Sequence, residues 1–387
     1  MNIKKILLLS VLIVLLFSCN VKGFNEDANN KTNQDNKKVE ELYNYITNIN
    51  SQYEFLKDID VKDYVKHYMQ KGESKLSGKK LIKHFITYAF REVHASLKLM
   101  AILIIIAVIC ALLTNLQKAF SNESLSNIAY FACYSLIIII MTKSFYIGVK
   151  IANESINKMT DFMAALIPVL IMLVASVGGF VEAAILDPII IGAINISSQI
   201  FVKIIIPIII ITFVLQFANN ISSDYKVDKL TKLLNQIALW SQGIIMTVFI
   251  GIITIRGISS QTIDEVTSRT AKFAVDNFVP IVGKCLSDAI GTVAGYSMLL
   301  KNVISSLGLF MLVIMISFPL IKILAMVLMY KLTAALIEPI SDGRLVNCIS
   351  SAGDSLILIM SCLICVCVMF FIMIAIIASA GRLMIGV

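Results

Sequence analysis

Long apolar runs, separated by short polar stretches, occupy the chain from residue 99 almost to its end. Each run is close to or above the roughly 20 residues that a helix needs to cross a bilayer. The runs are Leu99–Leu116, Ser126–Val149, Phe162–Phe180, Ile189–Phe217, Ile237–Ile255, Val303–Tyr330 and Ser355–Ala380. This pattern predicts an all-α, polytopic helical membrane protein, with an antiparallel transmembrane hairpin at 99–150 and a multi-pass core at 151–387.

The chain before these runs divides into two predicted parts. Lys4 and Lys5 precede the apolar run Ile6–Phe17, which at twelve residues is too short to span but fits a signal peptide or anchor at 1–23. Cleavage after Gly23 and a lipoprotein-like site at Cys19 are alternative interpretations. Residues 24–98 begin as a polar, flexible stretch and continue with helical periodicity, which predicts a small N-terminal helical extramembrane domain.

Composition supports a membrane protein and limits its chemistry. The chain is 58% hydrophobic and only 15% charged, against about 25% charged in soluble proteins. Its net charge of +8 comes without a nucleic-acid motif, so a lipid bilayer or an acidic partner explains the charge more simply than nucleic acid does. The three histidines all precede Leu99, which excludes a histidine metal site inside the membrane.

The stretch 269–301 organises the chain, because charges recur there between apolar runs. Lys272 and Asp276 are four residues apart, as are Lys284 and Asp288, and Pro280 stands between the pairs. On one helix each pair shares a face. The segment is too polar for lipid on every side, so we expect it to line a cavity, lie at an interface, or pack against other helices.

Ionisable residues within apolar segments are costly, which makes them candidates for a transport path. They are Asp161, Glu182, Lys203, Lys272, Asp276, Lys284, Asp288 and Lys322. Pairing between helices and placement near the headgroups are the alternative interpretations of each. Candidate helix breaks are Pro168, Gly178, Gly179, Pro207, Pro280, Gly283 and Pro319.

No motif predicts an enzyme. Cys362, Cys365 and Cys367 invite a metal interpretation, but a helix turns Cys367 away from the other two and no histidine is near, so core packing is favoured. No phosphate-binding loop, nucleophile elbow or zinc-protease helix is present. The sequence therefore predicts no catalytic residues, no metal and no cofactor.

The chain matches itself weakly at an offset of 112 residues. Pro168 then aligns with Pro280, and Pro207 with Pro319, which would define units 157–256 and 269–368. A true duplication and the chance matching of aliphatic runs both fit. If the duplication is real, about three segments per unit would make the units an inverted repeat, as in transporter folds.

Several segments resemble the stage III sporulation protein AE family of endospore-forming bacteria. They are Arg269–Val293, Tyr330–Leu345, Phe162–Leu170 and Thr247–Gly257, and the likeness extends from about residue 125 to the C-terminus. The resemblance implies a multi-pass protein of the mother-cell membrane that surrounds the forespore. It also implies membership of a secretion-like channel assembly with other stage III sporulation membrane proteins, including ring-forming and ATPase subunits.

Three functions follow as hypotheses. The first is a non-enzymatic membrane subunit of this channel complex, forming or gating a path with the segment 269–301. The second is a structural platform that recruits partner subunits, and the third is an independent small-solute transporter. The charges within an apolar frame motivate the first two, and the possible inverted repeat favours the third.

The orientation of the N-terminal part is a testable expectation. A signal peptide places residues 24–98 outside, although their lysine-rich end favours the cytoplasm by the positive-inside rule. We follow the signal peptide, since long polar domains cross the membrane largely regardless of charge. A cysteine at Ser51, in a chain without native cysteines, should react with a membrane-impermeant thiol reagent added outside intact cells, with Ser222→Cys mapped alongside. Labelling of Ser51→Cys only after lysis would contradict this orientation.

Overall fold

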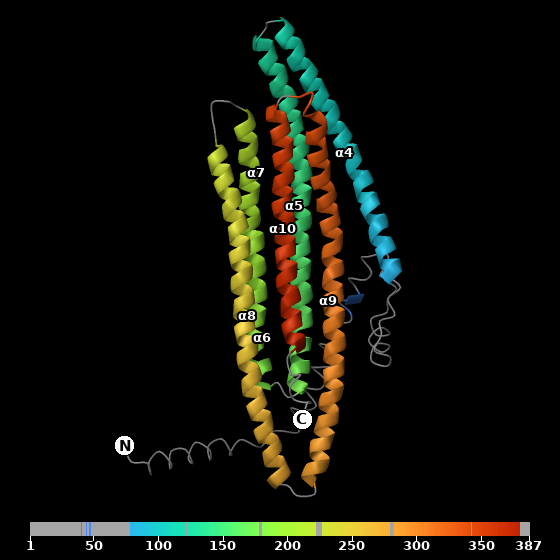
Figure 1. The fold of residues 1–387 in the computed structure, drawn as a ribbon, viewed down its shortest axis with the longest axis vertical. Coiled ribbons are helices and arrows are strands. Elements are labelled where there is room, and N and C mark those ends of the chain that lie inside the picture. Colours follow the sequence, from blue (N-terminus) through green and yellow to red (C-terminus); the bar gives the residue numbers. More distant parts are fainter. Residues whose placement is uncertain are drawn as a thin grey trace, which may run out of the picture.

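A bundle of long antiparallel helices makes up the computed structural model (Figure 1). The structure describes residues 40, 44, 46, 47, 78–120, 123–177, 180–221, 227–278, 282–341 and 343–379. Its helices are α4 (Gly78–Phe120), α5 (Glu123–Ser176), α6 (Phe180–Ile200), the π-helix η2 (Phe201–Ile205), α7 (Ile206–Ile221), α8 (Asp228–Phe278), α9 (Val282–Ile337) and α10 (Gly343–Ser379). The predicted all-helical class is confirmed for these residues.

Among the described residues, six helices are long and apolar enough to cross a membrane. The candidate spans are Ile86–Leu113, Tyr134–Ser176, Ile189–Ala218, Asp228–Ile255, Gly295–Ile337 and Gly343–Ser379. The spans on α5 and α9 have 43 residues each. At about 1.5 Å per residue they measure about 65 Å, roughly twice the hydrocarbon thickness of a bilayer.

The separate spans predicted at Ser126–Val149 and Phe162–Phe180 are wrong, because α5 runs through both without a break. The polar stretch between them, Ile151–Asp161, contains no glycine or proline, so its polarity does not interrupt the helix. Pro168 also lies inside α5. The domain boundaries and the signal peptide stay predictions, since residues 1–39 lie outside the described part of the chain and α4 continues across residue 98.

The candidate break at Pro207 has a clear local effect. The π-helix Phe201–Ile205 directly precedes it and joins α6 to α7 in one rod. Proline lacks the amide hydrogen that would bond to the carbonyl of Lys203 and its ring crowds that carbonyl, so the wider π turn relieves the clash. Pro319 lies inside α9. Gly283 is the second residue of α9, whereas Gly178, Gly179 and Pro280 lie outside the described residues.

The helices that the structure describes do not show the inverted repeat. At the offset of 112, the rod α6 to α7 corresponds to α9, and α8 corresponds to α10. One antiparallel span lies between the helices of each pair, so the matched helices run in the same direction (Figure 1). The α8–α9 connection would also fall inside α5. The first segment of the unit 157–256 is only the C-terminal part of α5, whose N-terminal part lies outside the unit. The duplication itself stays a prediction.

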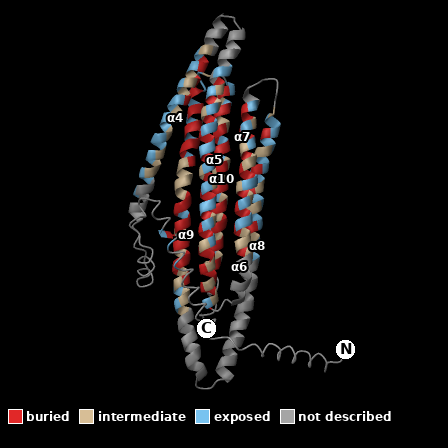
Figure 2. Cartoon of the chain, turned by 180° about the vertical axis from the view of Figure 1, so that it is seen from behind, coloured by how far each residue is buried: buried red, intermediate tan, exposed pale blue. Residues whose placement is uncertain are grey.

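The core lies where α5, α9 and α10 face one another, as the buried residues in Figure 2 show. Buried tyrosine hydroxyls find partners on neighbouring helices, as such groups require. Tyr134 Oη lies 3.3 Å from the carbonyl oxygen of Phe217 and 3.4 Å from Cys348 Sγ, both within hydrogen-bond distance. Tyr330 Oη donates to the carbonyl of Met141 at 3.3 Å. These bonds join helices far apart in the sequence.

Close helix packing predicts which glycines tolerate a side chain. A Cβ atom at Gly148 would lie 2.7 Å from Leu356 Cδ2 and 3.4 Å from Met326 Cε, whereas one at Gly243 would meet nothing within 4 Å. We expect Gly148→Val to destabilise the protein by about 1–3 kcal/mol through overpacking. Thermal unfolding in detergent measures this loss, and Gly243→Val, also within a helix, is the matched control. Equal melting temperatures for the two variants would contradict the packing.

Candidate functional site

Charged and polar side chains form an exposed row on α5, in the middle of its 43-residue span. Lys150, Glu154, Asn157, Lys158 and Asp161 are all exposed, and their spacing places them along one side of the helix. Lys150 Nζ lies 3.8 Å from Glu154 Oε1, and these side chains are 63% and 57% exposed. The ion pair Lys150–Glu154 is therefore exposed on the surface of the bundle rather than buried in its core.

The row continues onto the neighbouring rod α6–η2. Thr160 Oγ1 lies 2.7 Å from Ser198 Oγ, which joins α5 to α6 at this level. The adjacent exposed positions on the rod are Asn195, Gln199 and Lys203. Helical geometry places Asn195 and Gln199 on the side of α6 that borders α5. We call the combined set the polar face: Lys150, Glu154, Asn157, Lys158, Asp161, Asn195, Gln199 and Lys203.

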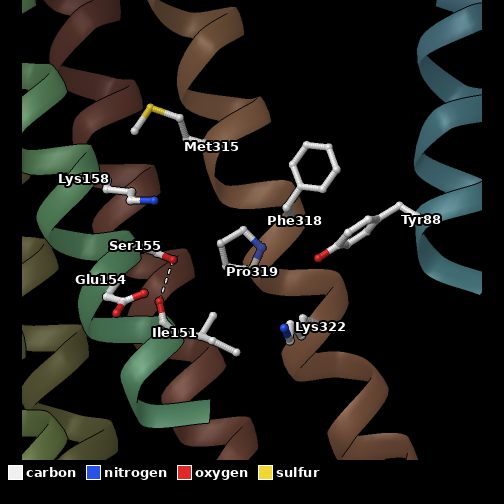
Figure 3. Close-up of a pocket in the computed structure, with 9 residues that line it drawn as sticks. All are labelled: Tyr88, Ile151, Glu154, Ser155, Lys158, Met315, Phe318, Pro319 and Lys322. Carbon is white, nitrogen blue, oxygen red and sulfur yellow. Dashed lines mark hydrogen bonds between the residues drawn. The ribbon is translucent and has the colours of Figure 1, made fainter. Parts of the chain in front are cut away.

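A pocket of about 200 Å³ opens beside the polar face, between α4, α5 and α9 (Figure 3). It is lined by Tyr88, Ile151, Glu154, Ser155, Lys158, Met315, Phe318, Pro319 and Lys322. Lys158 and Lys322 are directed into the space between α5 and α9, and the hydroxyl of Tyr88 points toward Pro319. The pocket thus brings two lysines from different helices to one opening.

Two features shape the wall of this pocket. The rings of Tyr88 and Phe318 meet edge to face with centroids 4.7 Å apart, which fixes α4 against α9. Pro319 has no amide hydrogen, so α9 loses the hydrogen bond that residue 319 would donate to the carbonyl of Met315. Both Met315 and Pro319 line the pocket. Pro319 therefore interrupts the hydrogen bonding of α9 at the opening.

The flank of α8 at the same level is apolar. Gly148 of α5 packs against Leu356 of α10, and five residues further along α10 Ser361 Oγ lies 2.6 Å from Gln242 Oε1 of α8. Gln242, in the middle of the apolar span Asp228–Ile255 of α8, is therefore level with the polar face. Its exposed side chains there include Trp240 at 71% and Ile244 at 59%. The flank on α8 is suited to contact with acyl chains, whereas the polar face on α5 and α6–η2 is not.

Three predicted site residues from separate segments meet in this region. Asp161 and Lys203 belong to the polar face, and Lys322 lines the pocket. Lys150, Glu154 and Lys158 were not among the predicted site residues, because the polar stretch Ile151–Asp161 was interpreted as a linker between two spans. Their spacing of four residues was the signal that could have found them.

Other polar residues lie inside the bundle. Lys301 of α9 is fully buried, and Ser355 Oγ of α10 lies 3.1 Å from Gln216 Oε1 of α7. Such contacts hold helices together in a membrane. Lys301 was not among the predicted site residues, although it stands between two apolar runs of the sequence. Cys362 and Cys367 lie in the hydrophobic core.

The stretch 269–301 is not one helix, which corrects the prediction. Lys272 and Asp276 belong to the end of α8, whereas Lys284 and Asp288 belong to the start of α9. The two helices meet at one end of the bundle, opposite the ends of α4 and α5 that adjoin each other (Figure 1). These four side chains and Glu182 lie outside the described residues, so their role stays a prediction.

Comparison with known proteins agrees with the resemblance. The sequence model of the family "Stage III sporulation protein AE" matches residues 59–381, which begins well before residue 125. A protein of Bacillus subtilis (strain 168), "Stage III sporulation protein AE", is 37% identical over 312 residues, covering 81% of this chain and 78% of the relative. No solved structure matches the chain. The chain belongs to the stage III sporulation protein AE family.

Proposed function

We propose that this multi-pass membrane protein is a subunit of a sporulation-specific, secretion-like channel complex between mother cell and forespore. In this proposal the polar face borders the transport path. The single observation that carries it is the row of charges in the middle of an apolar span, level with an apolar flank on α8. Charges inside a membrane favour water or a protein partner over acyl chains.

The packing of the bundle decides where such a path would run. The space between α5, α9 and α10 is filled by buried aliphatic and aromatic side chains. The polar face, in contrast, lies on the outside of α5 and η2. A path bordered by this face would therefore run along the protomer, between it and other subunits.

The α8–α9 connection extends the proposal to the predicted charged pairs. Lys272 and Asp276 on α8 approach the same end of the bundle as Lys284 and Asp288 on α9. We propose that these residues line or gate the path at that end, as two antiparallel helices rather than one. We also propose that Glu182 is one of the polar residues that line the path.

Membership of the family supports the proposed setting. The relative in Bacillus subtilis carries a stage III sporulation name. We propose that this chain acts in the mother-cell membrane around the forespore, with other stage III sporulation membrane proteins that include ring-forming and ATPase subunits. The protein is proposed to be non-enzymatic.

A structural platform is the second candidate. The observation that favours it is that charges pair within the chain: Lys150 with Glu154, and Lys331 Nζ with Asp354 Oδ1 at 2.7 Å. Such pairs could hold a surface to which partner subunits bind. The independent small-solute transporter loses its support, because the helices that would form its inverted repeat run in the same direction.

The reactivity of introduced cysteines tests whether the polar face is exposed to water. In a chain without native cysteines, within membranes of sporulating cells, Glu154→Cys should react with a charged methanethiosulfonate reagent. Ile244→Cys lies level with it on the apolar flank and should react much more slowly, since the thiolate forms only where water reaches it. Equally slow reaction at both positions, in protein shown to be inserted, would contradict a water-filled path.

Exchanging the two charges of an ion pair distinguishes the transport-path hypothesis from the structural-platform hypothesis. Lys150→Glu combined with Glu154→Lys preserves the ion pair but moves its charges along the face. If this pair borders a transport path, sporulation should be defective in the exchanged variant, because the electric field along the path is changed. The exchange of Lys232 with Asp228 on α8, a pair 2.7 Å apart, is the matched control and should be tolerated. Full sporulation with the exchanged Lys150 and Glu154 would favour the platform.

A further inference from the structure

The outer side of α4 carries two exposed stripes that belong neither to the polar face nor to the pocket. The helix lies at the outside of the bundle beside α9, and much of its length is exposed (Figure 1, Figure 2). The basic stripe is Lys83, Arg91, His94 and Lys98. The apolar stripe is Ile86, Phe90, Val93 and Leu97. Helical spacing places each stripe along one side of α4 and makes the two adjacent. We call them together the α4 face.

The α4 face has positive charge without matching carboxylates. Glu92 is the only acidic residue between Lys83 and Lys98, and helical geometry turns it to the opposite side of α4. Among the described residues, no carboxylate lies within ion-pair distance of Lys83, Arg91 or Lys98. The guanidinium carbon of Arg91 lies 5.1 Å from the centre of the Tyr88 ring, a contact that leaves the charge of Arg91 without a counterion. The face therefore attracts acidic groups.

Neither acyl chains nor water alone suit this face. The apolar span of α4 begins at Ile86, so Arg91 and Lys98 lie within it, where charges are costly against acyl chains. The apolar stripe is equally unsuited to water, since it is continuous and Phe90 is 71% exposed. An occupant that is apolar along one edge and acidic along the other satisfies both stripes.

The length of the α4 face distinguishes a protein from a membrane surface. At about 1.5 Å per residue, the face extends over about 22 Å from Lys83 to Lys98, whereas one headgroup layer of a bilayer is about 5–8 Å thick. A helix that binds headgroups along its length lies in the plane of the membrane. Residues 83–98 instead belong to one unbroken helix with the apolar residues that follow, and the rings of Tyr88 and Phe318, with centroids 4.7 Å apart, hold this part of α4 along α9. The occupant therefore runs alongside α4, as a second helix does.

We propose that the α4 face binds an acidic amphipathic helix of a partner protein. Apolar residues of that helix, at intervals of three and four, pack against Phe90 and Leu97, and its Asp or Glu side chains face Lys83 and Lys98. A second copy of this chain is a poor occupant, because the chain has a net charge of +8 and two α4 faces repel each other. This surface is independent of whether the polar face borders a path.

Site-specific photocrosslinking of the full-length protein, in membranes of sporulating cells, tests this surface. Phe90 is replaced by p-benzoylphenylalanine, and mass spectrometry identifies the cross-linked peptides. We expect an adduct with a segment of another protein whose apolar residues have helical spacing and are flanked by Asp or Glu. K83E/K98E should lower the yield at least about fivefold, because like charges then face each other, and K83R/K98R should retain it. Changing the acidic residues of the captured helix to Lys should restore the yield with K83E/K98E.

Two controls assign the effect to the α4 face. K143E/K229E reverses two exposed lysines elsewhere and should change the yield by less than about twofold. p-Benzoylphenylalanine at Ile105, which is exposed on the same side of α4 beyond the basic stripe, should not give this adduct. Adducts with lipid alone would identify a membrane surface, and adducts with this chain would identify a second copy or its own N-terminal part. Either result, the absence of a protein adduct, or an unchanged yield in K83E/K98E would overturn the proposal.

Discussion

The high cost of a charge among acyl chains is the constraint on which the architecture depends. Most of the exposed surface of α8 is apolar at the level of Trp240, whereas α5 at that level exposes Lys150, Glu154 and Asp161. A bundle with two such different flanks is not surrounded uniformly by lipid. We propose that it lies in the membrane with one side against lipid and the other against water or protein.

Helix length adds a second constraint of the same kind. The apolar spans of α5 and α9 measure about 65 Å, against about 30 Å for the hydrocarbon core. Part of each helix therefore lies beyond the hydrocarbon or is covered by other protein. Exposed apolar residues such as Ile105 and Ile139, at 58% and 64%, belong to the α4–α5 end of this long bundle. Both the length and the polar face are features that an assembly of subunits accommodates better than a single protomer in lipid.

Much of this arrangement could be predicted from the sequence, because apolar runs of 20 residues have few alternatives to helices in a membrane. The family could also be identified from short motifs. The number of spans could not, since the polar stretch 151–161 was interpreted as a break although nothing in it opposes a helix. Pro207 and Pro319 were correctly noticed, but one is accommodated by a π turn and the other continues inside α9. Tertiary context decides between these outcomes.

The site shows the same limit. Asp161, Lys203 and Lys322 were each named from their apolar surroundings, yet only the packing of α5 against α6 and α9 shows that they lie in one region. The pocket depends on a contact between Tyr88 and Phe318, 230 residues apart, which no local pattern encodes. Lys301 was not singled out, because it was taken only as the last residue of the stretch 269–301, yet it is fully buried.

The most direct measurement is an electron cryomicroscopy map of the protein within its native membrane assembly, at a resolution that shows ordered lipids. The account predicts acyl-chain density along α8 beside Trp240, and water or another subunit against Glu154 and Asp161. Ordered acyl chains packed along Lys150, Glu154 and Asp161 would contradict it.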